Sequence, residues 1–291
     1  MSAAILRFSP PRSDGAANAT DRHQRAEGRL AISFARRGEN THLADVYQRS
    51  PCRVLFPRPV GGEPPLAVLV NTSGGLAGGD RVSMSVTVEP GAAATVTTQA
   101  AEKVYRSLGP DARVETRLVV GEGARLEWLP QESILFEGAC LDRRISAKLA
   151  PDSRLLACES LIFGRVARGE AMTRGRVREF WHIERGGRLA WVDRFGLLGG
   201  IAAQLDGPGF RGARALATAI YAGPDAPTML PLARQVAEEE GGGASLINGV
   251  LVARLLDANP PYLRDGLARL LGALRRAAFG SPTGALPLWA I

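Results

Sequence analysis

The sequence is poor in the residues that bind transition metals tightly. Among its 291 residues are three cysteines and three histidines. None of them stands at the short spacing that a Cys and His metal site needs, and an odd, scattered set of cysteines argues against a disulfide framework. We therefore expect Cys52, Cys140 and Cys158 to be reduced and buried, and no cofactor to be bound tightly.

Long apolar runs are also missing. No segment approaches the roughly 20 consecutive apolar residues that span a bilayer. The first residues lack the basic and then apolar pattern of a secretion signal. The sequence therefore predicts a cytoplasmic protein that does not enter a membrane.

Lysine and aromatic residues are scarce as well. Only Lys103 and Lys148 are lysines among the 36 basic residues, and aromatic residues make up 6% of the chain. The net charge of +7 comes from arginines that alternate with Asp and Glu along the whole sequence. Nucleic-acid binders gather such charge in one stripe with aromatics, so we expect no nucleic-acid partner. The arginines fit a solvated surface or, alternatively, contact with an anionic protein partner.

The distribution of apolar residues predicts one large domain behind a tail. Residues 1–27 are rich in small and polar residues, which predicts a flexible N-terminal tail. We expect residues 28–291 to form a single domain, because 45% of the chain is hydrophobic and this is enough for a sizeable core. Its β-rich part covers 28–215, and a helix-containing part covers 225–280.

Strand patterns dominate up to about residue 215. The clearest is residues 81–89, where Val82, Met84, Val86 and Val88 alternate with polar residues in the period of a half-buried strand. Turn residues follow about every 30 positions, near Pro90, Gly121, Pro151 and Gly186, which indicates a degenerate repeat. We interpret the repeat as strands stacked in layers, in a β-solenoid-like sheet architecture.

Helical patterns occur only in the C-terminal third. Residues 227–240 carry apolar side chains at helical spacing. Residues 259–280 begin with Asn259 as a candidate cap and end at Gly280. One apolar stripe runs along this second helix, formed by Leu263, Leu267, Leu270, Leu271 and Leu274. The predicted fold is therefore mainly β with two α-helices in the C-terminal third.

The most unusual segment is residues 71–81, which hold four glycines within six positions: Gly74, Gly75, Gly78 and Gly79. Such density predicts positive φ angles or a close approach of another chain segment. A phosphate-binding loop needs a GxGxxG or Gly-Lys-Ser/Thr pattern and a following helix. Here a strand follows, and Asp80 would repel a phosphate. This weakens the alternative of a nucleotide-binding enzyme.

Further polar blocks follow the glycine segment at 97–107, 126–134, 158–165 and 168–170. In this order the blocks resemble the signature of the UreD/UreH family of urease accessory proteins, and the resemblance extends from about residue 28 to the C-terminus. Leu288 departs from the family's Leu-Pro-Arg-x-Trp ending. The motif residues that the resemblance marks are Gln99, Glu102, Lys103, Tyr105, Arg106 and Gln131.

The resemblance implies a role and a set of partners. Members of this family are not enzymes; they join the accessory proteins UreF and UreG on the urease apoprotein subunits. They assist nickel transfer into the buried urease active site. The resemblance thus implies a scaffold through which nickel passes in transit, and a mostly β fold with two helices.

The repeat suggests where such an ion could pass. Equivalent positions in stacked strands lie roughly 4.8 Å apart, and counting past each turn reaches Thr97, Leu129, Glu159 and Asp193. Oxygen ligands hold a borderline cation less firmly than thiolate or imidazole ligands do. A protein that must release its metal would benefit from such weak sites.

Four carboxylates are the candidate residues of this transient route: Asp80, Glu132, Glu159 and Glu170. The alternative is that these carboxylates form ion pairs with nearby arginines, namely Arg106, Arg165 and Arg194. A different function remains open too. A β-solenoid carbohydrate-active enzyme would use paired carboxylates such as Glu132 and Glu159, although aromatics, which usually line glycosidase clefts, are few.

Because the sequence lacks clustered Cys and His, we predict that the isolated chain binds nickel with a dissociation constant of roughly micromolar or weaker. Titration calorimetry with a nickel salt measures this directly. Nanomolar binding would show that distant residues form a tight site that the sequence does not reveal.

Overall fold

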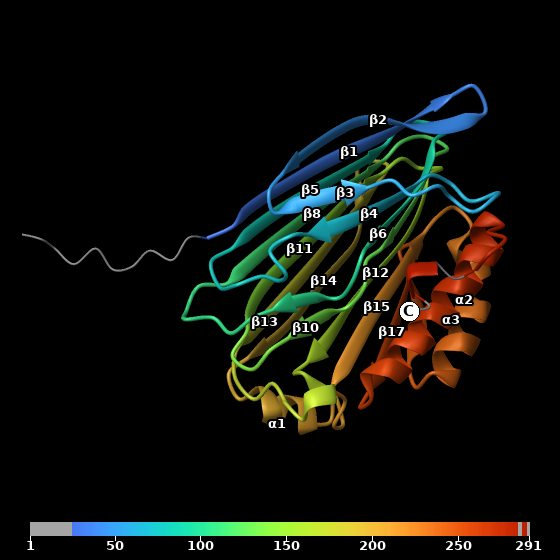
Figure 1. Ribbon diagram of the computed structural model, residues 1–291. Coiled ribbons are helices and arrows are strands. Elements are labelled where there is room, and N and C mark those ends of the chain that lie inside the picture. The colour runs from blue at the N-terminus through green and yellow to red at the C-terminus, as the bar shows by residue number, and fades with distance from the viewer. Residues whose placement is uncertain (1–24, 285–286, 290–291) are drawn as a thin grey trace, which may run out of the picture.

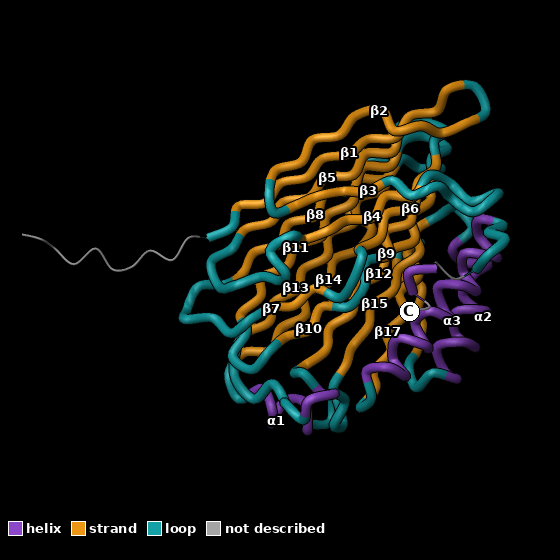
Figure 2. The backbone as a smooth tube through the Cα atoms, in the orientation of Figure 1, coloured by secondary structure: helices purple, strands orange, loops and turns teal. Residues whose placement is uncertain are grey.

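The computed structural model describes residues 25–284 and 287–289, so almost all of the predicted N-terminal tail (1–27) lies outside the described residues. Two β-sheets face each other along the length of the molecule (Figure 1). Two long helices cover the outer face of one sheet only, as the purple coils in Figure 2 show.

The first sheet has seven strands. From one edge to the other they are β14 (Arg188–Leu198), β13 (Arg176–Arg185), β11 (Cys140–Leu149), β8 (Ala112–Val120), β5 (Arg81–Val88), β1 (Glu27–Arg37) and β2 (Asn40–Arg49). The inner strands β13, β11, β8, β5 and β1 run parallel to one another, whereas β14 and β2 are antiparallel edge strands.

The second sheet has a main row of eight strands and two short strands beside it. The row is β16 (Gly243–Ile247), β17 (Val250–Asp257), β15 (Ala215–Ala222), β12 (Arg154–Phe163), β9 (Arg125–Leu129), β6 (Ala93–Thr98), β4 (Leu66–Asn71) and β3 (Cys52–Leu55). The short strand β10 (Ser133–Leu135) pairs in parallel with the end of β12, and β7 (Glu102–Val104) pairs in parallel with β10.

The chain crosses repeatedly between the two sheets. It passes from β5 to β6 and β7, then from β8 to β9 and β10, and then from β11 to β12. Corresponding strands of successive passes pair in parallel, as Val96 with Trp128 and Trp128 with Ala157. These passes are stacked coils, so the predicted β-rich, solenoid-like architecture is confirmed.

The register of the paired strands shows that the predicted column of polar positions is wrong. Thr97 does pair with Leu129, but the pairing of Trp128 with Ala157 places Glu159 one position too far along β12. Successive side chains of a strand point to opposite faces. Glu159 therefore faces the space between the sheets, whereas Leu129 packs under the helices.

The prediction of a fourth repeat unit is also wrong, because residues 186–187 do not begin another coil. They form a hairpin between the antiparallel strands β13 and β14 of the first sheet. Asp193 lies in β14, opposite Trp181, and not in a stack with Glu159.

Two hydrophobic cores share the second sheet. The larger core lies between the sheets, where alternate residues of β8 such as Val114 and Leu118 are buried. The smaller core lies between the second sheet and the helices. All eight residues of β15 are buried, because one face meets each core.

Both predicted helices are present as α2 (Ala226–Glu239) and α3 (Pro260–Phe279). The leucine stripe of α3 is buried in the smaller core, and each such leucine contributes about 1.5–3 kcal/mol of burial free energy. Asn259 precedes α3, but its side chain makes no capping hydrogen bond; its carbonyl accepts the amides of Tyr262 and Leu263. Gly280 ends the helix with a φ of 64°.

Shorter helical elements complete the described chain. The six-residue α1 (Ile201–Asp206) was not predicted, and 3₁₀ turns form at Val166–Arg168 and Pro287–Trp289. No helix within residues 25–284 and 287–289 has the length and apolar character needed to cross a membrane. The prediction of buried, unbridged cysteines is confirmed for Cys52, Cys140 and Cys158.

The glycine segment lies at the edge of the short strands β7 and β10. Leu76 pairs with Val104 in a parallel bridge, so the glycine segment packs directly on the block that contains β7. Gly74, Gly75 and Gly79 have φ angles of 75°, 152° and 94°, which confirms the prediction of special backbone angles. Gly78 has an ordinary φ, but a Cβ there would lie 2.1 Å from the Ser107 hydroxyl.

Gly75 and Gly74 form a matched pair for a test of this packing. A Cβ on Gly75 would lie 2.5 Å from the Tyr105 ring and 2.8 Å from the Lys103 carbonyl, whereas a Cβ on Gly74 would meet nothing within 4 Å. We predict that Gly74→Ala costs about 1–2 kcal/mol, for its left-handed backbone alone. Gly75→Ala should cost roughly 1–3 kcal/mol more, because of overpacking. Urea unfolding of both variants measures the difference, and equal stabilities would contradict this account.

Candidate functional site

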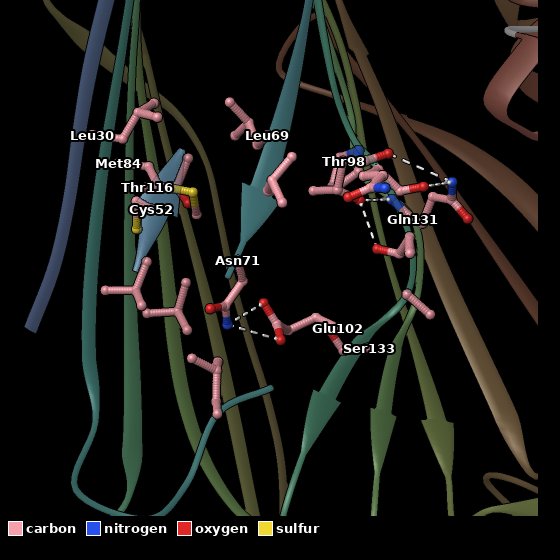
Figure 3. A pocket seen from close by; sticks show the side chains of 18 of the residues that line it. Leu30, Cys52, Leu69, Asn71, Met84, Thr98, Glu102, Thr116, Gln131 and Ser133 are labelled. Carbon is pink, nitrogen blue, oxygen red and sulfur yellow. Dashed lines mark hydrogen bonds between the residues drawn. The ribbon is translucent and has the colours of Figure 1, made fainter. Parts of the chain in front are cut away.

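An interior cavity of about 250 Å³ lies between the two sheets. Figure 3 shows its lining side chains, with Leu30, Met84 and Thr116 on the first sheet and Leu69 on the second. Most of its wall is apolar. The polar side chains that line it are Arg53, Asn71, Thr98, Gln99, Glu102, Lys103, Thr116, Gln131, Ser133, Arg143 and Glu159.

The cavity connects the protein surface with the deep interior. Gln99, Ala100 and Lys103 line it and are exposed to solvent. Trp128 and Glu159 also line it, and they are only 2% and 6% exposed. A small solute can therefore approach a buried carboxylate from the surface.

A cluster of three charged side chains lies at the buried end of the cavity. Arg143 projects from β11, Glu179 from β13 of the same sheet, and Glu159 from β12 of the facing sheet. The Arg143 Nη1 atom contacts a carboxylate oxygen of Glu159 and lies 3.4 Å from a carboxylate oxygen of Glu179. We call these three residues the buried charge cluster.

Neutral hydrogen-bonding groups fix the geometry of the buried charge cluster. The indole N–H of Trp128 donates to Glu159 Oε1 over 3.1 Å, and the indole N–H of Trp181 donates to Glu179 Oε1 over 3.1 Å. The Arg143 Nη2 group donates to the Ser133 hydroxyl on β10. Buried charges need such partners, because an unpaired one would be very costly.

Burial changes the proton affinity of these carboxylates. Desolvation raises the pKa of Glu179 from 4.5 to about 7, against the opposing charge of Arg143. Desolvation also raises the pKa of Glu159, and Arg143 and the Trp128 hydrogen bond oppose that increase. One arginine thus serves two carboxylates, and its charge does not fully offset the burial of either.

A further carboxylate lines the cavity nearer its opening. The pKa of Glu102, on β7, is raised by burial, although two hydrogen bonds from the Asn71 amide, over 3.1 and 3.2 Å, oppose the increase. Figure 3 shows this pair facing the cavity. The cavity therefore presents carboxylate oxygens at two depths.

Of the four carboxylates predicted to form a transient metal route, Glu159 lines the cavity and Asp80 does not. Asp80 is buried in the glycine segment, where its two oxygens accept the backbone amides of Ala26 and Ala77 over 2.8 Å each. This carboxylate holds the turn that precedes β5.

Glu132 and Glu170 lie elsewhere. Glu132 lines an outer groove between β10 and the start of α3, on the opposite face of the second sheet from Glu159. Glu170 is half-buried and forms an ion pair with Arg165, the alternative considered from the sequence. Because a sheet separates them, Glu132 and Glu159 cannot act on one glycosidic bond.

Four of the motif residues line the cavity, namely Gln99, Glu102, Lys103 and Gln131, and Tyr105 and Arg106 directly follow β7. The Tyr105 hydroxyl donates to the Gly74 carbonyl over 2.9 Å, and the backbone of Arg106 forms an isolated antiparallel β-bridge with Ala139. Gln131 donates from its side-chain amide to the Gln99 carbonyl over 3.2 Å. Glu102 and Lys103 form β7 itself. The glycine segment and the later blocks, which are distant in sequence, thus form one continuous region.

Sequence reasoning missed Arg143 and Glu179. A signal for both was present, because Arg143 falls in phase with Leu141 and Ile145 on the buried face of β11. Glu179 likewise falls between the buried Val177 and Trp181 of β13. A charged residue on the apolar face of a period-two strand marks a buried polar site.

A second buried ion cluster lies outside the cavity. Arg275 of α3 donates to Glu127 of β9 over 2.9 Å and to Glu63 over 2.7 Å. Ser281 also donates to Glu63. This cluster joins α3, the second sheet and a loop, so its evident role is to hold the helix on the sheet.

The raised pKa of Glu179 predicts a pH-dependent free energy of unfolding. Between pH 4.5 and about 7 the folded state holds a proton that the unfolded state has released, so this group's stabilisation is present at low pH and is lost as pH rises through 7. Relative to Glu179→Gln, the wild type should lose up to about 1.4 kcal/mol per pH unit in this window.

Denaturant unfolding at pH 5, 6 and 7 measures this difference. Glu170→Gln is the control, because the Glu170 pKa is lowered by Arg165 and should not titrate in this window. Parallel pH profiles for the wild type and Glu179→Gln would contradict the assignment.

Comparison with known proteins identifies the family. The family model described as UreD urease accessory protein matches residues 26–290. The urease accessory protein UreD of Methylobacterium sp. strain 4-46 is 43% identical over 263 residues, which cover 87% of this chain and 93% of the relative. UreD of Azorhizobium caulinodans is 42% identical, with 88% and 95% covered. UreD 1 of Methylobacterium radiotolerans is 44% identical, with 92% and 95% covered.

These matches agree with the resemblance seen in the glycine segment and the following blocks. They also show that the carbohydrate-active enzyme considered from the sequence is wrong, since the relatives are accessory proteins and not catalysts. The chain belongs to the UreD family of urease accessory proteins.

Proposed function

We propose that this chain is a scaffold in urease maturation, and that it guides nickel through its interior cavity toward the urease active site. In this proposal it binds the urease apoprotein subunits together with the accessory proteins UreF and UreG. Nickel is cargo in transit and not a resident cofactor.

The observation that carries the proposal is the cavity itself. It extends from exposed residues such as Lys103 to the buried Glu159, and Glu102 lies between them on its wall. Carboxylate oxygens attract a divalent cation without the tight hold of thiolate or imidazole groups. Such a wall suits an ion that must be released.

The edges of the sheets support the proposed binding of protein partners. β2 is an edge strand that exposes Leu43, Val46 and Tyr47 by 37%, 42% and 50%. At the opposite edge, β14 exposes Leu189 and Leu198 by 59% each. Apolar side chains on open edge strands favour pairing with another protein.

We predict that Glu159→Gln lowers nickel loading of urease by roughly tenfold or more, the effect of losing about 1.4 kcal/mol of cation attraction. The variant should stay folded. Arg143 keeps Glu179 as its partner, so no buried charge is left unpaired. Nickel per urease active site and urease activity in cells that express each variant are the measurements.

Glu170→Gln is the matched control, because Glu170 pairs with Arg165 away from the cavity and should load nickel normally. Thermal unfolding and co-purification with urease establish that both variants fold and assemble. Normal loading by a folded Glu159→Gln variant would contradict passage through the cavity.

A further inference from the structure

The buried charge cluster has the arrangement of a two-carboxylate ion site that is already filled. The Oε1 atom of each glutamate accepts an indole N–H, from Trp128 for Glu159 and from Trp181 for Glu179. The Oε2 atom of each glutamate faces the same atom, Arg143 Nη1. Two carboxylate oxygens from facing sheets therefore converge on one point, and a guanidinium nitrogen occupies it.

The position of this point ties it to the cavity. Arg143, Glu159 and Ser133 line the cavity, and Glu179 lies behind Arg143 on the neighbouring strand. An ion that reaches this end of the cavity thus meets the guanidinium together with the first carboxylate. Arg143 is 5% exposed and has no other carboxylate partner among the described residues.

We infer that Arg143 is a tethered cation that occupies the place of a divalent ion between Glu159 and Glu179, and so prevents the cavity wall from retaining nickel. The inference rests on the proposed function and names the residue that keeps the ion's residence short. Once Glu179 as well as Glu159 is ionised, the two carboxylates exceed one guanidinium by a single negative charge. The cluster therefore attracts a passing cation, but it cannot coordinate the cation fully unless Arg143 moves aside.

The test replaces Arg143 and measures nickel affinity of the full chain. Arg143→Met keeps an unbranched side chain but removes the charge, which leaves the two Oε2 atoms free to bind a metal. We expect nickel chloride to bind this variant at least tenfold more tightly than the wild type in titration calorimetry at pH 8. Arg143→Lys retains a positive charge between the two carboxylates and should therefore bind nickel like the wild type.

A double variant tests whether both carboxylates are needed. Arg143→Met combined with Glu179→Gln has one carboxylate at this point and should lose the gain in affinity. Glu102→Gln combined with Arg143→Met should keep the gain, because the Glu102 carboxylate is hydrogen-bonded to Asn71 and forms no ion pair with Arg143. A folded Arg143→Met variant without tighter binding, or equal gain in the Arg143→Lys variant, would overturn the inference.

Loss of a buried partner can also prevent folding. If Arg143→Met is unfolded alone, nickel must restore its fold, because a ligand that binds only the folded state stabilises it. Magnesium, which demands octahedral geometry and gives up its bound waters reluctantly, should restore it less well. An unfolded variant that nickel does not rescue would show that Arg143 is purely structural.

A second readout separates this inference from the proposed function. In the urease activation assay, Arg143→Met should retain nickel and lower loading, so tighter binding accompanies weaker delivery. Normal loading by Glu159→Gln would contradict the passage of nickel through the cavity, whatever affinities calorimetry gives. If Glu159→Gln impairs loading but Arg143→Met does not bind nickel more tightly, passage through the cavity is supported and the proposed role of Arg143 is contradicted.

Discussion

The pairing of buried charges between the two sheets is the constraint on which the interior of this molecule depends. Arg143 comes from one sheet and Glu159 from the other, so their contact joins the two layers across the larger core. Removal of Arg143 would leave both carboxylates without their cation, and an uncompensated buried charge costs about 3–5 kcal/mol, a large share of the stability of a typical domain. The fold therefore depends on these charges, and the proposed passage of nickel must occur without removing them.

The stacked coils explain why such a cluster can exist beside a cavity. Parallel coils place residues of successive passes next to one another, so side chains from β10, β11, β12 and β13 meet at one depth. The short strands β7 and β10, together with the glycine segment, form the side of the coil that closes over the cavity. The apolar remainder of the wall gives the few polar groups a low-dielectric setting, in which each of them has a large effect.

Much of the fold could be predicted because its signals are local. Val82 to Val88 alternate in the period of a strand, and the leucine stripe of α3 has the period of a helix. The composition of the glycine segment was enough to predict its unusual backbone φ angles. The register of the stack could not be predicted, because the shift of one residue that turns Glu159 inward comes from how β9 and β12 pair.

The candidate site was only partly predictable for the same reason. Glu159 was identified through its polar block, whereas Glu132, from a neighbouring block, lies on the other face of the sheet. Arg143 and Glu179 lie outside those blocks, and their importance follows from contacts between strands that are distant in sequence. Strand phase could have shown that they point inward, but not that they share one partner.

The position of nickel in the protein is the most direct test of this account. Crystals of the full chain soaked in millimolar nickel chloride, measured at the nickel absorption edge, would locate the ion by anomalous scattering. Because millimolar nickel fills even weak sites, we expect an anomalous peak inside the cavity, within contact distance of the Glu102 or Glu159 carboxylate. Peaks confined to the outer surface, with none in the cavity, would contradict it.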